Sequence, residues 1–351
     1  MLLTTLRDWA PFRIDALGLV TILGAAEVDV AVGRLVHNCL TEWLPILGAY
    51  TVASNQVATP LPGFVLYNVT DGIMATDLSS WLTRWLISYP LTYTSTVLRV
   101  RSVPIKLSRQ RQIAAPLLAT FTILPVVILT AAMGDWWGLA NAVSMILSVL
   151  VRRSIVNQNR HAVDAAVIEA QKITDENVTT FVTTPNGQAV TMYAPRMIVV
   201  NCFLTNPRPS NPTFYDMMRA LGWVAFGVHI VALGMARLFS QILSVLLLAI
   251  SSVISIRQIG DHHNLVGSRL CFEIYSGDPK ETRSAAYARM RLSESEENSM
   301  IQWNLFPHRS NVRWWAKYRN ILQTLAVQGP HITTQQKSSS QQSSPQQSSP
   351  Q

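Results

Sequence analysis

Histidines next to an acidic residue are the feature of this chain that most suggests chemistry. His262 and His263 follow Asp261 directly, and imidazole and carboxylate groups are both metal ligands and proton carriers. A metal site needs several convergent ligands, but the sequence has no HExxH motif and no other histidine-rich segment near this cluster. The three residues are therefore either a site or part of a solvated loop beside a membrane, and we favour the loop.

A second histidine, His229, lies alone in a strongly apolar stretch. An ionisable side chain inside a membrane span is costly and is a functional hypothesis by default. A neutral imidazole that hydrogen-bonds to a neighbouring helix is the other interpretation, which we favour because such contacts commonly join membrane helices. His229 is still the best single residue to mutate.

Motifs of the common enzyme classes are missing from the sequence. It contains no paired DDxxD or NDxxD acids, no GxSxG, no P-loop and no dinucleotide-binding glycine pattern. The sequence thus predicts no metal and no cofactor, and His229, His262 and His263 are the only catalytic candidates.

The composition places part of the chain in lipid. Of the 351 residues, 49% are apolar and 14% are charged, whereas a soluble domain has roughly 25% charged residues. The net charge of +8 comes from basic residues beside long apolar runs, where anionic headgroups and insertion orientation explain them better than nucleic acid does. We therefore expect a lipid bilayer as partner and no nucleic acid.

Four apolar runs predict two transmembrane hairpins. The first pair is Ile113 to Met133 and Gly138 to Val151, and the second is Leu221 to Met235 and Phe239 to Ser255. Basic residues gather at the outer ends of both hairpins, and by the positive-inside rule these ends are cytosolic. The domains therefore divide into hairpins at 113–151 and 219–256 and cytosolic regions at 152–218 and 257–330.

The N-terminal region, 1–98, contains two weaker apolar segments, 43–67 and 81–98. If both cross the membrane, the protein has six helices instead of four. The sequon at Asn68 would then be lumenal and open to N-glycosylation, whereas the sequon at Asn177 should be cytosolic and unmodified.

The polar regions carry recognisable local signals. A helix is expected over 152–173, and Pro185-Asn186-Gly187 predicts a β-hairpin that makes the insert a small β-containing module. Ser293 with Glu296 predicts a helix start. The aromatic and basic run from Arg313 to Arg319 is expected to rest on headgroups and not on nucleic-acid bases, and the Gln/Ser/Pro tail 331–351 is expected to be disordered.

Residues 184–231 (TPNGQAV to GVHIV) and 300–319 (MIQWNL to AKYR) resemble uncharacterised multi-pass membrane proteins of filamentous fungi. The resemblance covers about the last two thirds of the chain and implies no reaction and no site residue. The sequence thus predicts an α-helical integral membrane protein of the secretory pathway or plasma membrane. A non-catalytic scaffold or accessory protein with cytosolic partners is the leading hypothesis, followed by a membrane-bound enzyme of a lipid or secondary-metabolite pathway, and then a small oligomeric transporter or channel.

Overall fold

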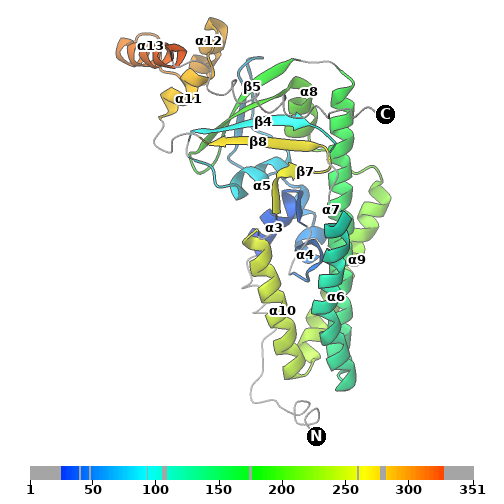
Figure 1. Ribbon diagram of the computed structural model, residues 1–351. Coiled ribbons are helices and arrows are strands. Elements are labelled where there is room, and N and C mark those ends of the chain that lie inside the picture. Colours follow the sequence, from blue (N-terminus) through cyan, green and yellow to red (C-terminus); the bar gives the residue numbers. More distant parts are fainter. Residues whose placement is uncertain are drawn as a thin grey trace, which may run out of the picture.

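The structure is a computed structural model that describes residues 25–38, 41–46, 49–92, 94–104, 109–173, 176–258, 261–276 and 282–327. Figure 1 shows two parts: a group of long helices and, at one end of it, a sheet with shorter helices. Helix α7 (Trp136–Gln171) runs through both parts. The expected disordered tail lies outside the described residues.

The long helices form two consecutive antiparallel hairpins, and the first helix of the second hairpin packs chiefly against the second helix of the first hairpin. Among the described residues, three helices are long and apolar enough to cross a membrane: α7, α9 (Pro212–Met235) and α10 (Leu238–Ile256). Helix α6 (Arg109–Ala132) pairs with α7, and its described apolar part, Thr120–Ala132, is shorter. The prediction of long apolar helices in these regions is confirmed. The pairs, below called the apolar helix group, comprise α6, the first half of α7, α9 and α10.

One carboxylate stabilises both hairpin turns at the free end of this group. Asp135 caps α7 by accepting a hydrogen bond from the Gly138 amide at 3.0 Å, and its second oxygen accepts from the Arg237 amide at 3.1 Å. Amides at helix N-termini lack partners within the helix, so a carboxylate there satisfies donors that would otherwise be unpaired. The two hairpins are therefore fixed to each other at their turns.

The sheet is far larger than the predicted β-containing insert. Eight described strands form one mixed sheet in the order β1-β7-β8-β4-β6-β5-β2-β3. They are β1 (Val36–Asn38), β2 (Val65–Asn68), β3 (Ile73–Ala75), β4 (Thr96–Ser102), β5 (Asn177–Thr183), β6 (Ala189–Pro195), β7 (Asp261–Val266) and β8 (Leu270–Ser276). The predicted hairpin is β5 and β6, but its neighbours in the sheet, β2 and β4, come from before the first long helix, and β7 and β8 come from after the last. Strand β4 runs parallel to β6, and the other pairings are antiparallel.

The six-helix alternative is wrong. Segment 81–98 contains most of the short helix α5 (Ser80–Ser88) and the first part of β4. Segment 43–67 contains α4 (Ala49–Ala53), the 3-10 helix η2 (Gln56–Ala58) and most of β2. These residues are apolar because they lie in a protein core: Trp81 and Trp85 are each 1% exposed.

Two cores hold the sheet domain together, one on each face of the sheet. Strand side chains alternate between faces, and Val178 and Val182 of β5 belong to one core while Phe181 belongs to the other. The first face is covered by α5, by the second half of α7, and by α8 (Arg196–Ile198) with the π-helix η3 (Val199–Leu204). The second is covered by α11 (Arg283–Arg289), α12 (Glu294–Gln302) and α13 (Val312–Val327).

The C-terminal helices also correct a sequence-based expectation. The capping box of Ser293 and Glu296 at the start of α12 is confirmed. The run from Arg313 to Arg319, however, is not an interfacial helix, because its Trp315 and Tyr318 are buried against Phe306. Figure 1 shows α13 at the end of the sheet domain farthest from the apolar helix group. Region 257–330, which was predicted to be helical, contains strands β7 and β8 as well as helices α11 to α13.

Candidate functional site at the junction of helices and sheet

An irregular segment enters the apolar helix group from the sheet side. It comprises the 3-10 helix η1 (Thr41–Trp43) and the buried residues Leu44 to Ile46. Backbone carbonyls outside helices and strands need another donor when they are buried. Arg152 of α7 supplies it, donating from Nη2 to the carbonyls of Glu42 at 3.0 Å and Leu44 at 2.7 Å. Arg152 is thus a buried structural residue, although the sequence indicated only a basic end of a span.

Glu42 is the centre of a buried charged cluster next to this segment. Its Oε1 lies 2.7 Å from Nη2 of Arg160 and accepts a hydrogen bond from the Asn38 amide at 3.1 Å. Arg160 also donates to the carbonyls of Leu35 and Val36. Burial alone would raise the pKa of Glu42, but the charge of Arg160 and the hydrogen bonds outweigh it and lower the pKa.

His37 lies beside the same carboxylate but is held neutral. Its Nδ1 is 3.9 Å from Oε1 of Glu42. Burial, and next the positive charge of Arg160, lower the pKa of His37 to about 4, against the opposing effect of Glu42. The cluster at pH 7 is therefore an ion pair with a neutral imidazole at its edge.

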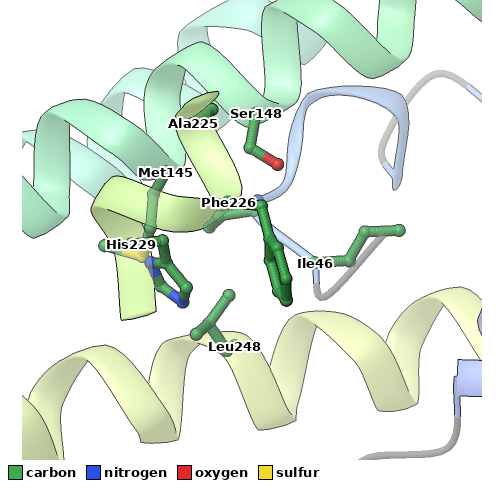
Figure 2. A pocket seen from close by; sticks show the side chains of 8 residues that line it. Ile46, Met145, Ser148, Ala225, Phe226, His229 and Leu248 are labelled. Atoms are coloured by element: carbon green, nitrogen blue, oxygen red, sulfur yellow. The ribbon is translucent and has the colours of Figure 1, made fainter. Parts of the chain in front are cut away.

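Two small cavities lie on either side of Ile46. The first, about 40 Å³, is lined by Glu42, Arg152, Arg160 and Ser255 together with Ile46 itself. The second, about 20 Å³, is enclosed by α7, α9 and α10 and is also lined by Ile46. Figure 2 shows the second cavity, with His229 directed toward Leu248 of α10 and with Ile46 and Ser148 on the other side of Phe226.

His229 has no hydrogen-bond partner in this cavity. It is 8% exposed, and neither Nδ1 nor Nε2 has a partner among the described residues. The favoured interpretation, a histidine hydrogen-bonded to a neighbouring helix, is therefore wrong. The side chain is buried and polar with both ring nitrogens unpaired, which is uncommon in folded proteins and calls for an explanation.

Further buried polar side chains line the interior of the apolar helix group. The Asn141 amide donates to Ser244 Oγ at 2.8 Å, which joins α7 to α10. Oδ1 of Asn141 and the hydroxyls of Ser240 and Ser252 have no partner in the described part of the chain. The interior therefore contains buried polar side chains beside the apolar cluster of Val126, Ala142, Met145 and Leu248.

A larger cavity, about 540 Å³, lies where α5, α7 and α9 meet the loop 205–209. Its lining mixes polar and apolar side chains: Leu35, Asn55, Val57, Ser80, Trp81, Asn159, Val163, Leu204, Thr205, Asn206, Arg208 and Tyr215 are among them. Tyr215 donates to Asn55 Oδ1 at 2.9 Å, and Asn206 accepts from the Ser80 hydroxyl at 3.0 Å. The lining side chains include one cation, Arg208, and no acid, histidine or cysteine.

Arg84 of α5 fixes the wall of this cavity. Its guanidinium is 2% exposed and pairs with Asp29 of α3 (Ala25–Gly33) at 2.7 Å. It also donates to the carbonyls of Gln56, Thr59 and Ser80. The cavity is therefore built on a buried ion pair in which every guanidinium nitrogen of Arg84 donates a hydrogen bond, whereas Oδ1 of Asp29 has no partner among the described residues.

The Asp261-His262-His263 cluster is not a solvated loop. These residues form the start of β7, which pairs with β1 and β8. The His263 carbonyl accepts a hydrogen bond from the Trp85 indole at 2.9 Å. The His263 ring packs edge-on against the Tyr89 ring. Nowhere in the described residues do three or more His, Cys, Asp or Glu side chains gather as a metal site would require. The structure also does not bring His262 or His263 to the cavity of His229.

The two sequons lie side by side in the sheet. Asn68 and Asn177 belong to the neighbouring strands β2 and β5, and Thr70 Oγ1 accepts from the Thr179 amide at 3.0 Å. The two sites must therefore share one side of any membrane, so the predicted separation by topology is wrong. Asn68 is 2% exposed and donates to Asp71 at 2.7 Å, which makes it a poor acceptor for a glycan in the folded protein.

Comparisons with known proteins yield no relative: no protein-family model, no curated protein and no solved structure matches this chain. Its function must therefore be argued from the junction itself.

Sequence reasoning missed most of the junction. Glu42 and Arg84 each interrupt or border an apolar segment, and a buried charge in such a place usually has a partner. That signal singles out both residues, but it does not identify Arg160 or Asp29 as the partners, since these lie more than 50 residues away along the chain.

Proposed function

We propose that the chain is a multi-pass membrane protein without catalysis of its own, which holds a folded domain at one membrane surface as a scaffold or accessory for protein partners. Helices α7, α9 and α10 have the length and apolar character that crossing needs. Side chains that would face lipid are apolar and outward, among them Phe121, Val224, Val231 and Ile250.

The observation that carries this proposal is the continuity of α7. This single helix has 36 residues, which at 1.5 Å per residue is about 54 Å. Its first half packs in the apolar helix group, and its second half covers the sheet through Val156, Val163 and Val167. The contacts of Arg152 and Arg160 brace the same joint. A domain joined to membrane helices in this way keeps one orientation to the bilayer, which is what a scaffold requires.

The distribution of charged and aromatic residues supports a cytosolic sheet domain. Arg152 lies in α7 where that helix leaves the apolar helix group, and Arg219 and Arg257 lie near the sheet-side ends of α9 and α10. The opposite end carries Trp136 and Trp137, exposed to 75% and 47%, as expected for side chains at headgroup level. By the positive-inside rule, this distribution favours a cytosolic sheet domain.

Two measurements test the proposal. The first maps topology with tags in the 185–187 turn and at residue 135; we expect the turn to be cytosolic and residue 135 lumenal. The second places a photo-crosslinking residue at Met74, exposed on edge strand β3, and a matched one at Trp136 on the opposite end. The same protein should crosslink reproducibly to Met74 and not to Trp136.

Deleting residues 258–330 does not test the scaffold, because it removes β7 and β8 from the middle of the sheet. Changing Met74 to glutamate leaves the core intact and should remove the crosslinked partner. The proposal fails if the topology map puts the turn at 185–187 in the cytosol and residue 135 in the lumen, but no protein crosslinks to the sheet domain.

A second candidate function is suggested by the 540 Å³ cavity. It lies beside the second half of α7 and the sheet-side end of α9, where lipid headgroups would be, and Arg208 is its one lining charge. Such a cavity favours binding of an anionic, hydroxyl-rich headgroup, as a lipid-pathway protein would need. Purified protein stripped of lipid should be stabilised against heat by phosphatidylinositol more than by phosphatidylcholine, and Asn159→Leu should remove the difference.

A further inference from the structure

We infer that the interior of the apolar helix group is a proton path, in which His229 takes up and releases the proton and Ile46 closes the path on the sheet side. This activity goes beyond a scaffold, and it rests on the proposed crossing of a membrane by these helices.

The cavity at His229 has the size and chemistry of a water site. A water molecule needs roughly 10–15 Å³ of cavity and two or more polar partners, and this cavity has about 20 Å³. The unpaired ring nitrogens of His229 and the hydroxyl of Ser148 are the polar side-chain groups of its lining. Lipid cannot satisfy an imidazole at this depth, so a water molecule is the simplest partner.

Polar side chains continue from the cavity along the same faces of α7 and α10 toward the turns. Residues four apart lie one above the other on a helix. Asn141 therefore lies one turn from the cavity residue Met145, and Ser244 one turn from Leu248, and these two polar residues are hydrogen-bonded to each other. Ser240, whose hydroxyl is unpaired, follows one turn further along α10.

The same spacing holds toward the sheet. Ser252 lies one turn beyond Leu248, and its hydroxyl is also unpaired. Arg152 lies one turn beyond Ser148, and Arg152 and Ser255 both line the 40 Å³ cavity of the Glu42 cluster. Groups that can donate or accept a hydrogen bond thus lie on both sides of the cavity of His229, and the apolar residues Met145 and Leu248 occupy the level of the cavity itself.

Ile46 is the apolar side chain that separates the two cavities on the sheet side. It is 4% exposed and lines both the cavity of His229 and the cavity of the Glu42 cluster. No other residue is shared by the two linings. A smaller side chain at this position would join the two cavities into one.

The chemistry at His229 is proton exchange, and no electrons are transferred. One ring nitrogen accepts a proton from a hydronium ion that arrives from one side and becomes water, and the other nitrogen then releases its own proton to a water molecule on the opposite side, which becomes hydronium. Rotation of the neutral ring exchanges the two nitrogens and restores the starting state. A cavity that holds one water excludes hydrated sodium and potassium ions, so the path is expected to pass protons only.

The test uses the full chain reconstituted in phosphatidylcholine vesicles that contain a pH-sensitive dye. Insertion is checked first by flotation and protease protection. A potassium gradient with valinomycin then sets the membrane potential, and the rate of internal pH change is compared with that of protein-free vesicles. We expect wild-type protein to raise this rate severalfold.

Three variants and a control decide the mechanism. His229→Leu should return the rate to the protein-free level, and His229→Gln should do the same while keeping a polar side chain. Ile46→Ala should raise the rate above wild type, and the double variant with His229→Leu should abolish that gain. Val231→Ala, on the lipid-facing side of α9, is the matched control and should behave as wild type.

The inference is overturned if inserted wild-type protein conducts no faster than protein-free vesicles, if either His229 variant conducts like wild type, or if Ile46→Ala is without effect. Release of the dye or of potassium through Ile46→Ala would show a non-selective leak and would also overturn it. A chain that fails to insert contradicts the proposed membrane crossing instead. If both His229 variants fail to fold, the rates of wild type and Ile46→Ala still test the inference, because it requires wild type to conduct protons and Ile46→Ala to conduct them faster.

Discussion

The buried arginines of the sheet domain and the buried histidine and two serines of the apolar helix group differ in their hydrogen bonding. At the base of the sheet, Arg84 and Arg160 each pair with a carboxylate and also donate to backbone carbonyls. Between the long helices, His229 and the Ser240 and Ser252 hydroxyls have no partner in the part of the chain that the structure describes. Because a buried polar group left unpaired costs about 1–3 kcal/mol, the first set stabilises the fold, whereas the second weakens it and needs another reason to exist.

The largest expected effect is the loss of the Arg84 ion pair. Arg84→Met leaves Asp29 buried without its cation, and removing one partner of a buried pair typically destabilises by about 3–5 kcal/mol. Unfolding in detergent by denaturant or heat measures it. The matched control is Arg101→Met, whose ion pair with Glu273 is 2.8 Å long but 42% exposed on the arginine side. It should cost no more than about 1 kcal/mol. Equal losses of unfolding free energy in Arg84→Met and Arg101→Met would contradict the stabilising role of the buried pair.

Glu42→Gln should have the next largest effect. The variant keeps the shape of the side chain but loses the charge that meets Arg160, and a hydrogen bond to a charged group contributes about 1.5–3 kcal/mol. The loss should appear as a lower unfolding temperature with no change in the helix content measured by circular dichroism. A variant as stable as wild type would show that Arg160 is held by the carbonyls of Leu35 and Val36 alone.

Acid should weaken the junction in two stages. His37 has a folded-state pKa lowered to about 4 from 6.5, so the unfolded chain binds its proton first and stability falls as the pH drops from about 6.5 to about 4. Glu42 has a lowered pKa, so its contribution is present above its ordinary pKa of 4.5 and is lost as the pH falls through its lower folded-state pKa. Unfolding measured between pH 7 and 4 should show the first stage, and His37→Gln should flatten it.

The smallest effect on stability should come from His229. His229→Leu removes two unpaired nitrogens and fills a similar volume, so we expect stability to be unchanged or higher by up to about 1–3 kcal/mol. The same variant should abolish proton flux. If it destabilises the protein as strongly as Arg84→Met, His229 is part of the structural set and the contrast between the two regions does not hold.

Local patterns in the sequence predicted the elements whose causes are local. The long apolar runs, the Pro185-Asn186-Gly187 turn and the capping box at Ser293 are each decided by neighbouring residues, and all three appear in the structure. Segment 81–98 was misread as a membrane segment because an apolar run bounded by charges has the same sequence pattern in a membrane span and in a protein core. The core position of Trp81 and Trp85 depends on ring contacts with Phe203 and Phe272, which come from distant parts of the chain and could not be predicted from local sequence.

Of the candidate site, the sequence allowed one residue, His229, to be predicted, but not the residues that surround it. The position of His229 in an apolar stretch pointed to the bundle interior, where the structure places it. Ile46 and Glu42 gave no such signal toward His229, because the segment 41–46 is irregular and its place between α7, α9 and α10 depends on contacts over more than 100 residues.

The strand order has a consequence for how the protein is made. Strands β7 and β8 lie between β1 and β4, although they are synthesised after all the long helices. The first hundred residues must therefore wait with open strand edges while both hairpins are inserted, and the sheet closes only when residue 276 has left the ribosome. Open edges and exposed tryptophans over that interval invite aggregation, so a chaperone that binds the nascent N-terminal region should raise the yield of folded protein.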